Sequence, residues 1–186
     1  MNRALAVSLA LLILGFLAPV TATARNPGLP LLEVNGLGPV SFGSPKAQVV
    51  ASLQRSLGAP NARGVNTGCG PRFSEVAWHD LVVEFRHDRF TGYRYVDGGW
   101  PISTPGSPRD RVAAGRTTPH LETALGITLG STLGAVRRAY GSLRRSGASQ
   151  WSATDGLTFG ESPADVDPTS PTSRITEIKL GTCGAF

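Results

Sequence analysis

Apolar residues recur at helical spacing in two stretches of the chain that lie 87 positions apart. Each stretch opens with an apolar-polar-apolar step and a Gly-Ser pair, at residues 40–44 and 127–131. The apolar stripes that follow are Val49, Val50, Leu53 and Leu57 in the first stretch, and Leu133, Val136 and Tyr140 in the second. Because such a stripe gives a helix one apolar face, the pattern predicts two amphipathic helices. Their predicted N-caps are Ser44 and Ser131, and their predicted ends are Gly58 and Gly141.

Patterns typical of β-strands follow each predicted helix. Residues 81–85 and 156–159 each carry an apolar-x-Phe step, and a tryptophan precedes each of them. Residues 89–95 and 174–180 both read basic, apolar, Thr, any, apolar, basic, apolar, at an offset of 85. The sequence therefore predicts an α+β fold in which two similar helix-then-strands units form an antiparallel sheet with helices on one face. The alternative is that two generic αβ segments look alike in a chain with 23 glycines.

The same pattern divides the chain into segments. We expect a first αβ unit at 25–97 and a second at 121–186, which together form one compact domain. Between them, residues 98–120 are rich in proline and glycine and read as a connector.

The first 24 residues have the features of a signal peptide. Arg3 precedes an uncharged apolar run at residues 4–17, and Ala22-Thr23-Ala24 offers a small-x-small cleavage pattern. That run of 14 residues is shorter than the roughly 20 that a helix needs to cross a bilayer. We therefore expect a secreted, extracytoplasmic protein with no membrane span in the mature chain, and an uncleaved anchor is the alternative.

Charge and cysteine content refine this expectation. The net charge is +5, and it becomes +4 when residues 1–24 and their single arginine are removed. Positive charge spread over the whole chain does not form a phosphate-binding stripe, so we expect no nucleic acid partner. An oxidising compartment favours one disulfide between Cys69 and Cys183, with two unpaired thiols or an intermolecular bridge as alternatives.

The sequence carries no complete catalytic, cofactor or metal motif. It lacks HExxH, CxxC and Gly-x-Ser-x-Gly, and its Gly36-x-Gly38 pair is not a phosphate-binding loop. A Ser-His-Asp arrangement assembled in space stays open, because such triads do not depend on sequence order. We expect no cofactor and no metal, and we interpret the candidate ligands Asp80 and Asp88 as turn residues and Asp165 and Asp167 as parts of a solvated loop.

Side-chain alternation along the strands sorts their residues into two faces. The set predicted to face the helices is Val83, Phe85, Tyr93, Tyr95, Leu157, Phe159, Ile178 and Leu180. The opposite set is Glu84, Arg86, Phe90, Arg94, Thr158, Ile175, Glu177 and Lys179. Isolated aromatic residues among charges of both signs are typical of a partner-binding surface, where arginine and aromatic side chains tend to be the anchors, so this set is our candidate binding site. The alternative is the solvated face of a one-sided sheet.

The step around Val40, Phe42, Gly43 and Ser44, repeated at Ile127, Leu129, Gly130 and Ser131, resembles the repeat of β-lactamase-inhibitor-protein-like and SmpA/OmlA-like αβ proteins. The resemblance covers most of residues 36–183 and implies one open sheet whose free side binds a protein. The sequence departs from it in its cysteines: the inhibitors tend to have a disulfide inside each repeat, and the lipoproteins have an acylated cysteine. Lactamase inhibition and outer-membrane assembly are therefore not carried over.

These observations predict a secreted, non-catalytic binding or inhibitor-like module that uses the open face of its sheet, with an extracellular or envelope protein as the partner. A secreted hydrolase acting on cell-envelope material is the alternative function. A weaker idea is association with anionic envelope polymers, since the chain is basic.

Overall fold

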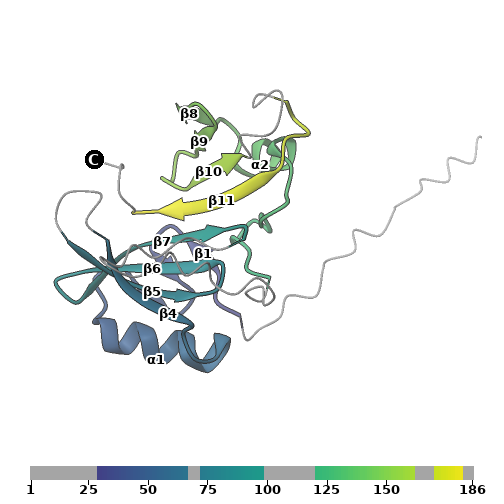
Figure 1. The fold of residues 1–186 in the computed structure, drawn as a ribbon. Coiled ribbons are helices and arrows are strands. Elements are labelled where there is room, and N and C mark those ends of the chain that lie inside the picture. The colour runs from purple at the N-terminus through teal and green to yellow at the C-terminus, as the bar shows by residue number, and fades with distance from the viewer. Residues whose placement is uncertain (1–28, 67–71, 99–119, 162–169, 182–186) are drawn as a thin grey trace, which may run out of the picture.

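The computed structural model describes residues 29–66, 72–98, 120–161 and 170–181. Within these ranges the fold is α+β, as predicted, with helices α1 (Lys46–Leu57) and α2 (Leu133–Tyr140) and strands in two sheets (Figure 1). None of the described helices is long and apolar enough to cross a membrane. The signal peptide, both cysteines, residues 99–119 of the connector, and Asp165 and Asp167 lie outside the described residues.

The larger sheet has eight strands in the order β4-β5-β6-β7-β11-β10-β9-β8, and every neighbouring pair is antiparallel. Its strands are β4 (Ala62–Asn66), β5 (Phe73–Trp78), β6 (Leu81–Arg86), β7 (Arg89–Val96), β8 (Arg144–Gly147), β9 (Gln150–Ser152), β10 (Thr158–Glu161) and β11 (Ile175–Leu180). The two strands β7 and β11, which are far apart in the sequence, pair at the middle of this sheet. The sequence pattern predicted β6, β7, β10 and β11, but it did not predict the other four strands.

A small sheet precedes α1 and was not predicted either. It is a meander of β1 (Leu32–Glu33), β2 (Gly36–Leu37) and β3 (Val40–Ser41). The hydroxyl of Tyr93 on β7 donates a hydrogen bond to the carbonyl of Glu33 at 3.0 Å, and the N–H of Leu32 donates to the carbonyl of Glu122 at 2.9 Å. The meander therefore ties the N-terminal part of the described chain to β7 of the larger sheet and to the segment that precedes α2.

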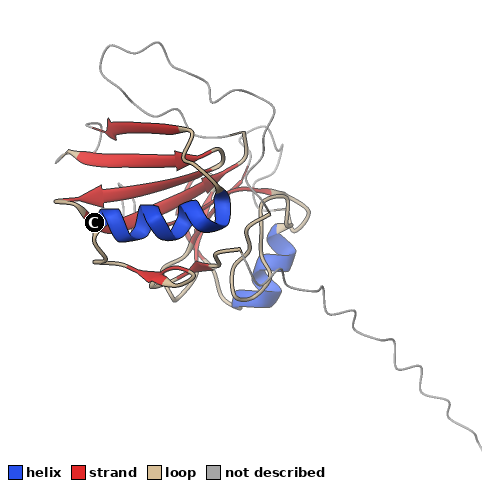
Figure 2. Ribbon diagram, turned by 90° about the horizontal axis from the view of Figure 1, so that it is seen from below, coloured by secondary structure: helices blue, strands red, loops and turns tan. Residues whose placement is uncertain are grey.

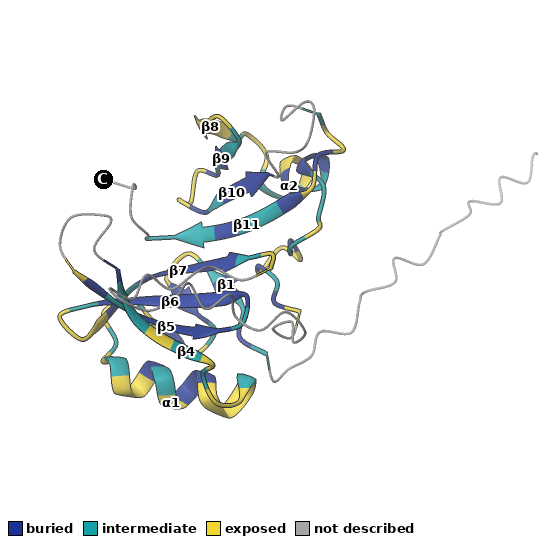
Figure 3. Ribbon diagram, viewed as in Figure 1, coloured by how far each residue is buried: buried dark blue, intermediate teal, exposed yellow. Residues whose placement is uncertain are grey.

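One apolar core joins these elements. Val49 and Leu53 of α1 and Val136 of α2 belong to the same buried cluster as the apolar side chains of the central strands. Figure 2 shows α1 lying across the strands of the larger sheet, and Figure 3 shows its exposed residues on the side away from them. The stripe of the first helix was thus correctly predicted, because apolar residues at helical spacing must be buried against a neighbour.

The helices end where the sequence predicted, but they begin one residue later. Gly58 and Gly141 follow the last helical residues with φ of 81° and 71°. The predicted caps Ser44 and Ser131 are wrong, because these residues still belong to the extended segment that pairs with the sheet. Ser44 accepts a hydrogen bond on its carbonyl from the N–H of Phe90 at 3.0 Å.

The cap positions are occupied by the next residue along the chain. Thr132 caps α2, with its hydroxyl accepting a hydrogen bond from the N–H of Ala135 at 3.2 Å. Pro45 occupies the same position in α1 and forms no side-chain cap.

We expect Thr132→Ala to lower the free energy of unfolding by about 1 kcal/mol, because it leaves a helix N–H without its side-chain acceptor. Urea denaturation measures this change. Ser44→Ala is the control and should change stability by less than about 0.5 kcal/mol, since the hydrogen bonds of Ser44 to other described residues are made by its backbone. A larger loss of stability for Ser44→Ala than for Thr132→Ala would contradict the assignment of Thr132 as a helix cap.

The predicted turns at Asp80 and Asp88 are confirmed. They form the tight connections β5–β6 and β6–β7, in which His79, His87 and Asp88 have φ of 52°, 49° and 56°. Short polar residues tolerate this left-handed conformation better than β-branched ones.

Candidate functional site

The residues predicted to face the helices are buried, as that prediction requires. Val83, Phe85, Tyr93, Tyr95, Leu157, Phe159 and Ile178 are all buried in the core, and Leu180 packs against it. Alternation gave the correct face for Tyr93, Tyr95 and Ile178, which lie in a regular stretch of the ladder between β7 and β11.

Two members of the candidate binding set, Phe90 and Ile175, lie in the core instead. Phe90 is 0% and Ile175 is 1% exposed. On β7, Gly92 faces Glu84 and Phe90 faces Phe85, which leaves Thr91 as an extra residue in the ladder. An extra residue reverses the alternation, so the side chains before and after Thr91 do not follow one pattern. Phe90 therefore points to the same face as Tyr93 and Tyr95, and the prediction that it is exposed was wrong.

A second irregularity of the same kind explains the burial of Ile175. On β11, Glu177 faces Gly160 and Ile175 faces Glu161, so Thr176 is the extra residue. Neither Phe90 nor Ile175 is available to a partner at the sheet surface.

Two further members, Glu84 and Arg94, lie on the face of the sheet opposite to Val83 and Tyr93, which we call the second face. Both residues are buried. A guanidinium nitrogen of Arg94 (Nη2) lies 2.8 Å from Glu75 Oε1 and 3.0 Å from Glu84 Oε1. Asn66 also donates to Glu75 Oε1 at 2.9 Å. These residues form a buried ionic cluster in which one cation serves two carboxylates. Substitutions here test folding more than binding.

Burial dominates the electrostatics of this cluster. The pKa of Glu84 is raised from 4.5 to about 7, mainly because the carboxyl is removed from water and also because of the charge of Glu75. The positive charges of Arg94 and Lys179 oppose this shift of the pKa. The Glu84 carboxyl therefore changes its charge near neutral pH.

The remaining members, Arg86, Thr158, Glu177 and Lys179, are partly exposed on the second face. Lys179 lies opposite Arg94 on one side and Thr158 on the other, and its ammonium forms an ion pair with Glu177 at 3.1 Å. Ser152 and Arg144 continue this cross-strand row to the edge of the sheet. Apart from Arg86 on β6, the accessible members of the predicted set thus lie in the β11-β10-β9-β8 half of the second face.

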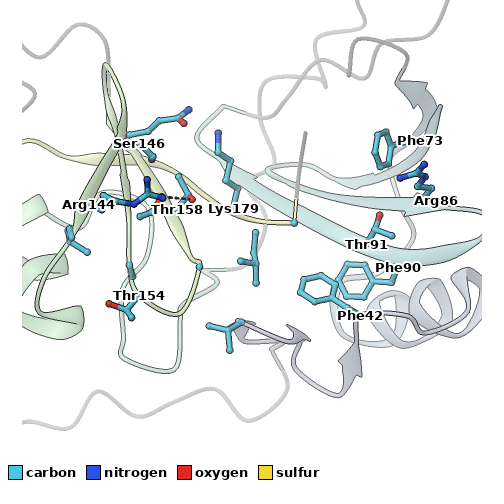
Figure 4. A pocket seen from close by; sticks show the side chains of 18 of the residues that line it. Phe42, Phe73, Arg86, Phe90, Thr91, Arg144, Ser146, Thr154, Thr158 and Lys179 are labelled. Carbon is cyan, nitrogen blue, oxygen red and sulfur yellow. Dashed lines mark hydrogen bonds between the residues drawn. The ribbon is translucent and has the colours of Figure 1, made fainter. Parts of the chain in front are cut away.

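A cleft of about 1580 Å³ opens at the end of this half, where the β7–β11 pairing stops. Figure 4 shows Arg144, Ser146, Thr154 and Thr158 on one side of it, Lys179 in the middle, and Arg86, Thr91 and Phe42 on the other side. Four of the predicted binding residues, Arg86, Phe90, Thr158 and Lys179, therefore line the cleft, although Phe90 is 0% exposed. Glu177 does not line it.

The lining of the cleft is basic. Its charged residues are Arg86, Arg89, Arg144, Arg145 and Lys179, and no aspartate or glutamate is among the lining residues that the structure describes. Its hydroxyl-bearing residues are Thr91, Ser142, Ser146, Ser152, Thr154 and Thr158. Such a surface offers many hydrogen-bond donors and a positive potential to a ligand.

Close backbone packing occurs beside the cleft, at Gly92 and Gly181. A side chain at Gly92 would meet the carbonyl of Gly181 at 2.6 Å, and Gly181 itself has φ of 67°. Two glycines are thus required where β7 and the end of β11 approach each other beside the cleft.

Sequence reasoning missed Glu75, Arg89, Arg144 and Arg145. Glu75 was missed because β5 was not predicted, although its Phe-x-Glu-x-Ala alternation was a usable signal. Arg144 and Arg145 were missed because the edge strand β8, to which they belong, was not predicted. No signal in a single sequence places residues 86–91 beside residues 142–158.

The described residues contain no group of three His, Cys, Asp or Glu side chains that could hold a metal ion. In the part of the chain that is described, the cleft is lined by neither a carboxylate nor an imidazole that could transfer a proton. The arrangement is suited to binding through charge and hydrogen bonds.

Comparison with known proteins gives no relative: no family model, no curated protein and no solved structure matches this chain.

Proposed function

We propose that this protein is a secreted, non-catalytic binding module, built from two similar αβ units, that holds a protein partner on the accessible half of its second sheet face and in the adjoining cleft. The observation that carries the proposal is the cleft, whose described lining has five basic residues and no acidic one. Like charges gathered at one concave place are costly unless a partner of opposite charge compensates them.

Matching hydrogen bonds support the two-unit part of the proposal. The N–H of Gly43 donates to the carbonyl of Phe90 at 2.8 Å, and the N–H of Gly130 donates to the carbonyl of Ile175 at 2.8 Å. The side chains of Arg89 and Arg174 then donate to the carbonyls of Gly43 and Gly130, at 3.1 and 2.8 Å. These pairs keep the offsets of 87 and 85 that relate the two stretches of sequence.

The order of elements supports it as well. Each helix is followed along the chain by four strands of the larger sheet, and the last strand of each set, β7 or β11, lies at its middle. The extra residues Thr91 and Thr176 occur at corresponding places in these two strands. Resemblance to αβ-repeat inhibitors, which suggested the same organisation, remains part of the proposal.

The hydrolase alternative has less support. Glu75 and Glu84 are the paired carboxylates of the second face, but they are 1% and 0% exposed and do not line the cleft. A general acid has to come within hydrogen-bonding distance of its substrate.

Site-specific crosslinking tests the proposal. A photoreactive amino acid at position 158 in the cleft should capture a discrete protein from the extracellular or envelope fraction of the producing cells. The same group at position 55, on the exposed side of α1, is the matched control and should not. Identical products from both positions, or capture of no protein at 158, would contradict the proposal. Turnover of wall material by the purified protein would replace it with the hydrolase.

A further inference from the structure

We propose that the cleft recognises an acidic, extended protein segment in which carboxylate side chains are interspersed with apolar ones. This inference rests on the proposed function, because it names the chemistry of the partner at the same surface. It stands on three features of the cleft: the state of its cations, their distribution over the walls, and the apolar residues between them.

The cations of the cleft are mostly unneutralised. Lys179 has Glu177 at 3.1 Å, whereas Arg86, Arg89, Arg144 and Arg145 have no carboxylate within ion-pair distance among the described residues. Arg89 donates to the carbonyl of Gly43, and Arg145 to those of Gly147 and Ala148. Carbonyl oxygens position these two guanidinium groups without cancelling their charge.

Arg86 and Arg144 are the most available of the set. The side chain of Arg144 is exposed and forms no hydrogen bond or ion pair with the other described residues. The Nε of Arg86 is buried and has no hydrogen-bond partner among the residues that the structure describes. A buried donor without an acceptor is costly, and a ligand oxygen would relieve that cost. The planar guanidinium group pairs well with a carboxylate.

The cations lie on opposite walls, which defines the shape of the ligand. Arg86 and Arg89 come from the β6–β7 hairpin, Arg144 and Arg145 from the edge strand β8, and Lys179 lies between them on β11 (Figure 4). A single anion would contact one wall only. A chain with several negative groups along its length can bridge the cleft.

Apolar side chains in the same lining favour a protein segment over a polymer that carries only anionic groups. Phe42 and Leu143 are partly exposed, and Val34 is 44% exposed although it is apolar. An apolar side chain of the ligand that covers these residues would gain from the removal of apolar surface from water. Polyphosphate or an anionic polysaccharide has no such group to offer.

Two synthetic peptides of equal length and charge test this inference by fluorescence anisotropy. One alternates glutamate with leucine, and the other alternates glutamate with serine. We expect the Glu/Leu peptide to bind about tenfold more tightly, since leucine can cover the apolar wall. Arg144→Ala should weaken binding of both peptides by up to about fivefold, Arg86→Ala should act similarly, and higher salt should weaken both.

Matched variants make the result specific. Arg55→Ala and Arg138→Ala remove the same charge from exposed positions on α1 and α2 outside the cleft, and they should leave both affinities unchanged. Val34→Ser should weaken the Glu/Leu peptide only. If all four arginine variants act alike, or if the two peptides bind equally and polyphosphate competes at equal charge, the inference is wrong. A crosslinked partner at position 158 whose capture is insensitive to Arg144→Ala and to salt would preserve the proposed function while excluding this ligand chemistry.

Discussion

Replacing Glu84 with glutamine is expected to raise the free energy of unfolding by about 3 kcal/mol at about pH 8.5, and to change it little below about pH 4.5. The cause is burial, which raises the pKa of Glu84 from 4.5 to about 7. Below pH 4.5 the carboxyl is protonated in both the folded and the unfolded chain. As pH rises from there to about 7, the unfolded chain releases this proton while the folded chain keeps it, so stability falls. Glutamine never ionises and escapes that loss.

Urea denaturation of both proteins across this pH range measures the difference. The charged groups that face Glu84 are Glu75 on β5, Arg94 on β7 and Lys179 on β11, and the substitution leaves all of them in place. Glu177→Gln is a control on the same face, and because its ion pair is partly exposed it should change stability by less than about 1 kcal/mol. Parallel stability curves for the parent and Glu84→Gln would contradict the predicted charge change of Glu84.

Arg94→Met is expected to cost about 3–5 kcal/mol near pH 8, because it leaves two carboxylates buried without the cation that they share. Arg94 lies within 3.0 Å of both Glu75 and Glu84, and it is 6% exposed. Methionine keeps most of the apolar stem, so the cost reports the missing charge more than a missing volume. Denaturant titration with circular dichroism gives the value.

A double substitution separates the charge effect from packing. Adding Glu84→Gln to Arg94→Met should restore part of the stability, since only one carboxylate is then left without its cation. Arg86→Met is the control on the same face: Arg86 is partly exposed and forms no ion pair among the described residues, so its loss should cost less than about 1 kcal/mol. Equal costs for Arg94→Met and Arg86→Met would show that the cluster contributes nothing specific.

The sequence predicted those parts of the fold that depend on local periodicity. The stripe of α1 and the alternation of Val83 with Phe85 both reflect a side-chain direction that repeats along a regular element. The prediction was wrong for Phe90 and Ile175, because one inserted residue in a ladder reverses the direction while the sequence keeps its alternation. No composition signal distinguishes Thr91 or Thr176 from an ordinary strand residue.

The candidate site was predicted only in part, for a related reason. Arg86, Thr158 and Lys179 were placed correctly on the second face, but their association with Arg144 depends on a pairing between strands that are distant in the sequence. The buried ionic cluster was missed because a charged residue in a strand is expected to face water. The cluster is buried because β5, β6 and β7 pair side by side, and the residues next to Glu84 and Arg94 in the sequence do not indicate this pairing.

The position of β11 has a consequence for how the chain folds during synthesis. This strand follows β8, β9 and β10 along the chain, yet it lies between β7 and β10 in the sheet. Strands β4 to β7 are consecutive neighbours and can pair as soon as they emerge. The free edge of β7, however, must wait for residues 87 positions further on, since Tyr93 pairs with Leu180. During that interval the nascent first half exposes a strand edge beside Tyr93 and Tyr95, and this edge can pair with another copy of the chain. Translation that slows before β11 should therefore promote aggregation, and a chaperone that shields the edge of β7 should prevent it.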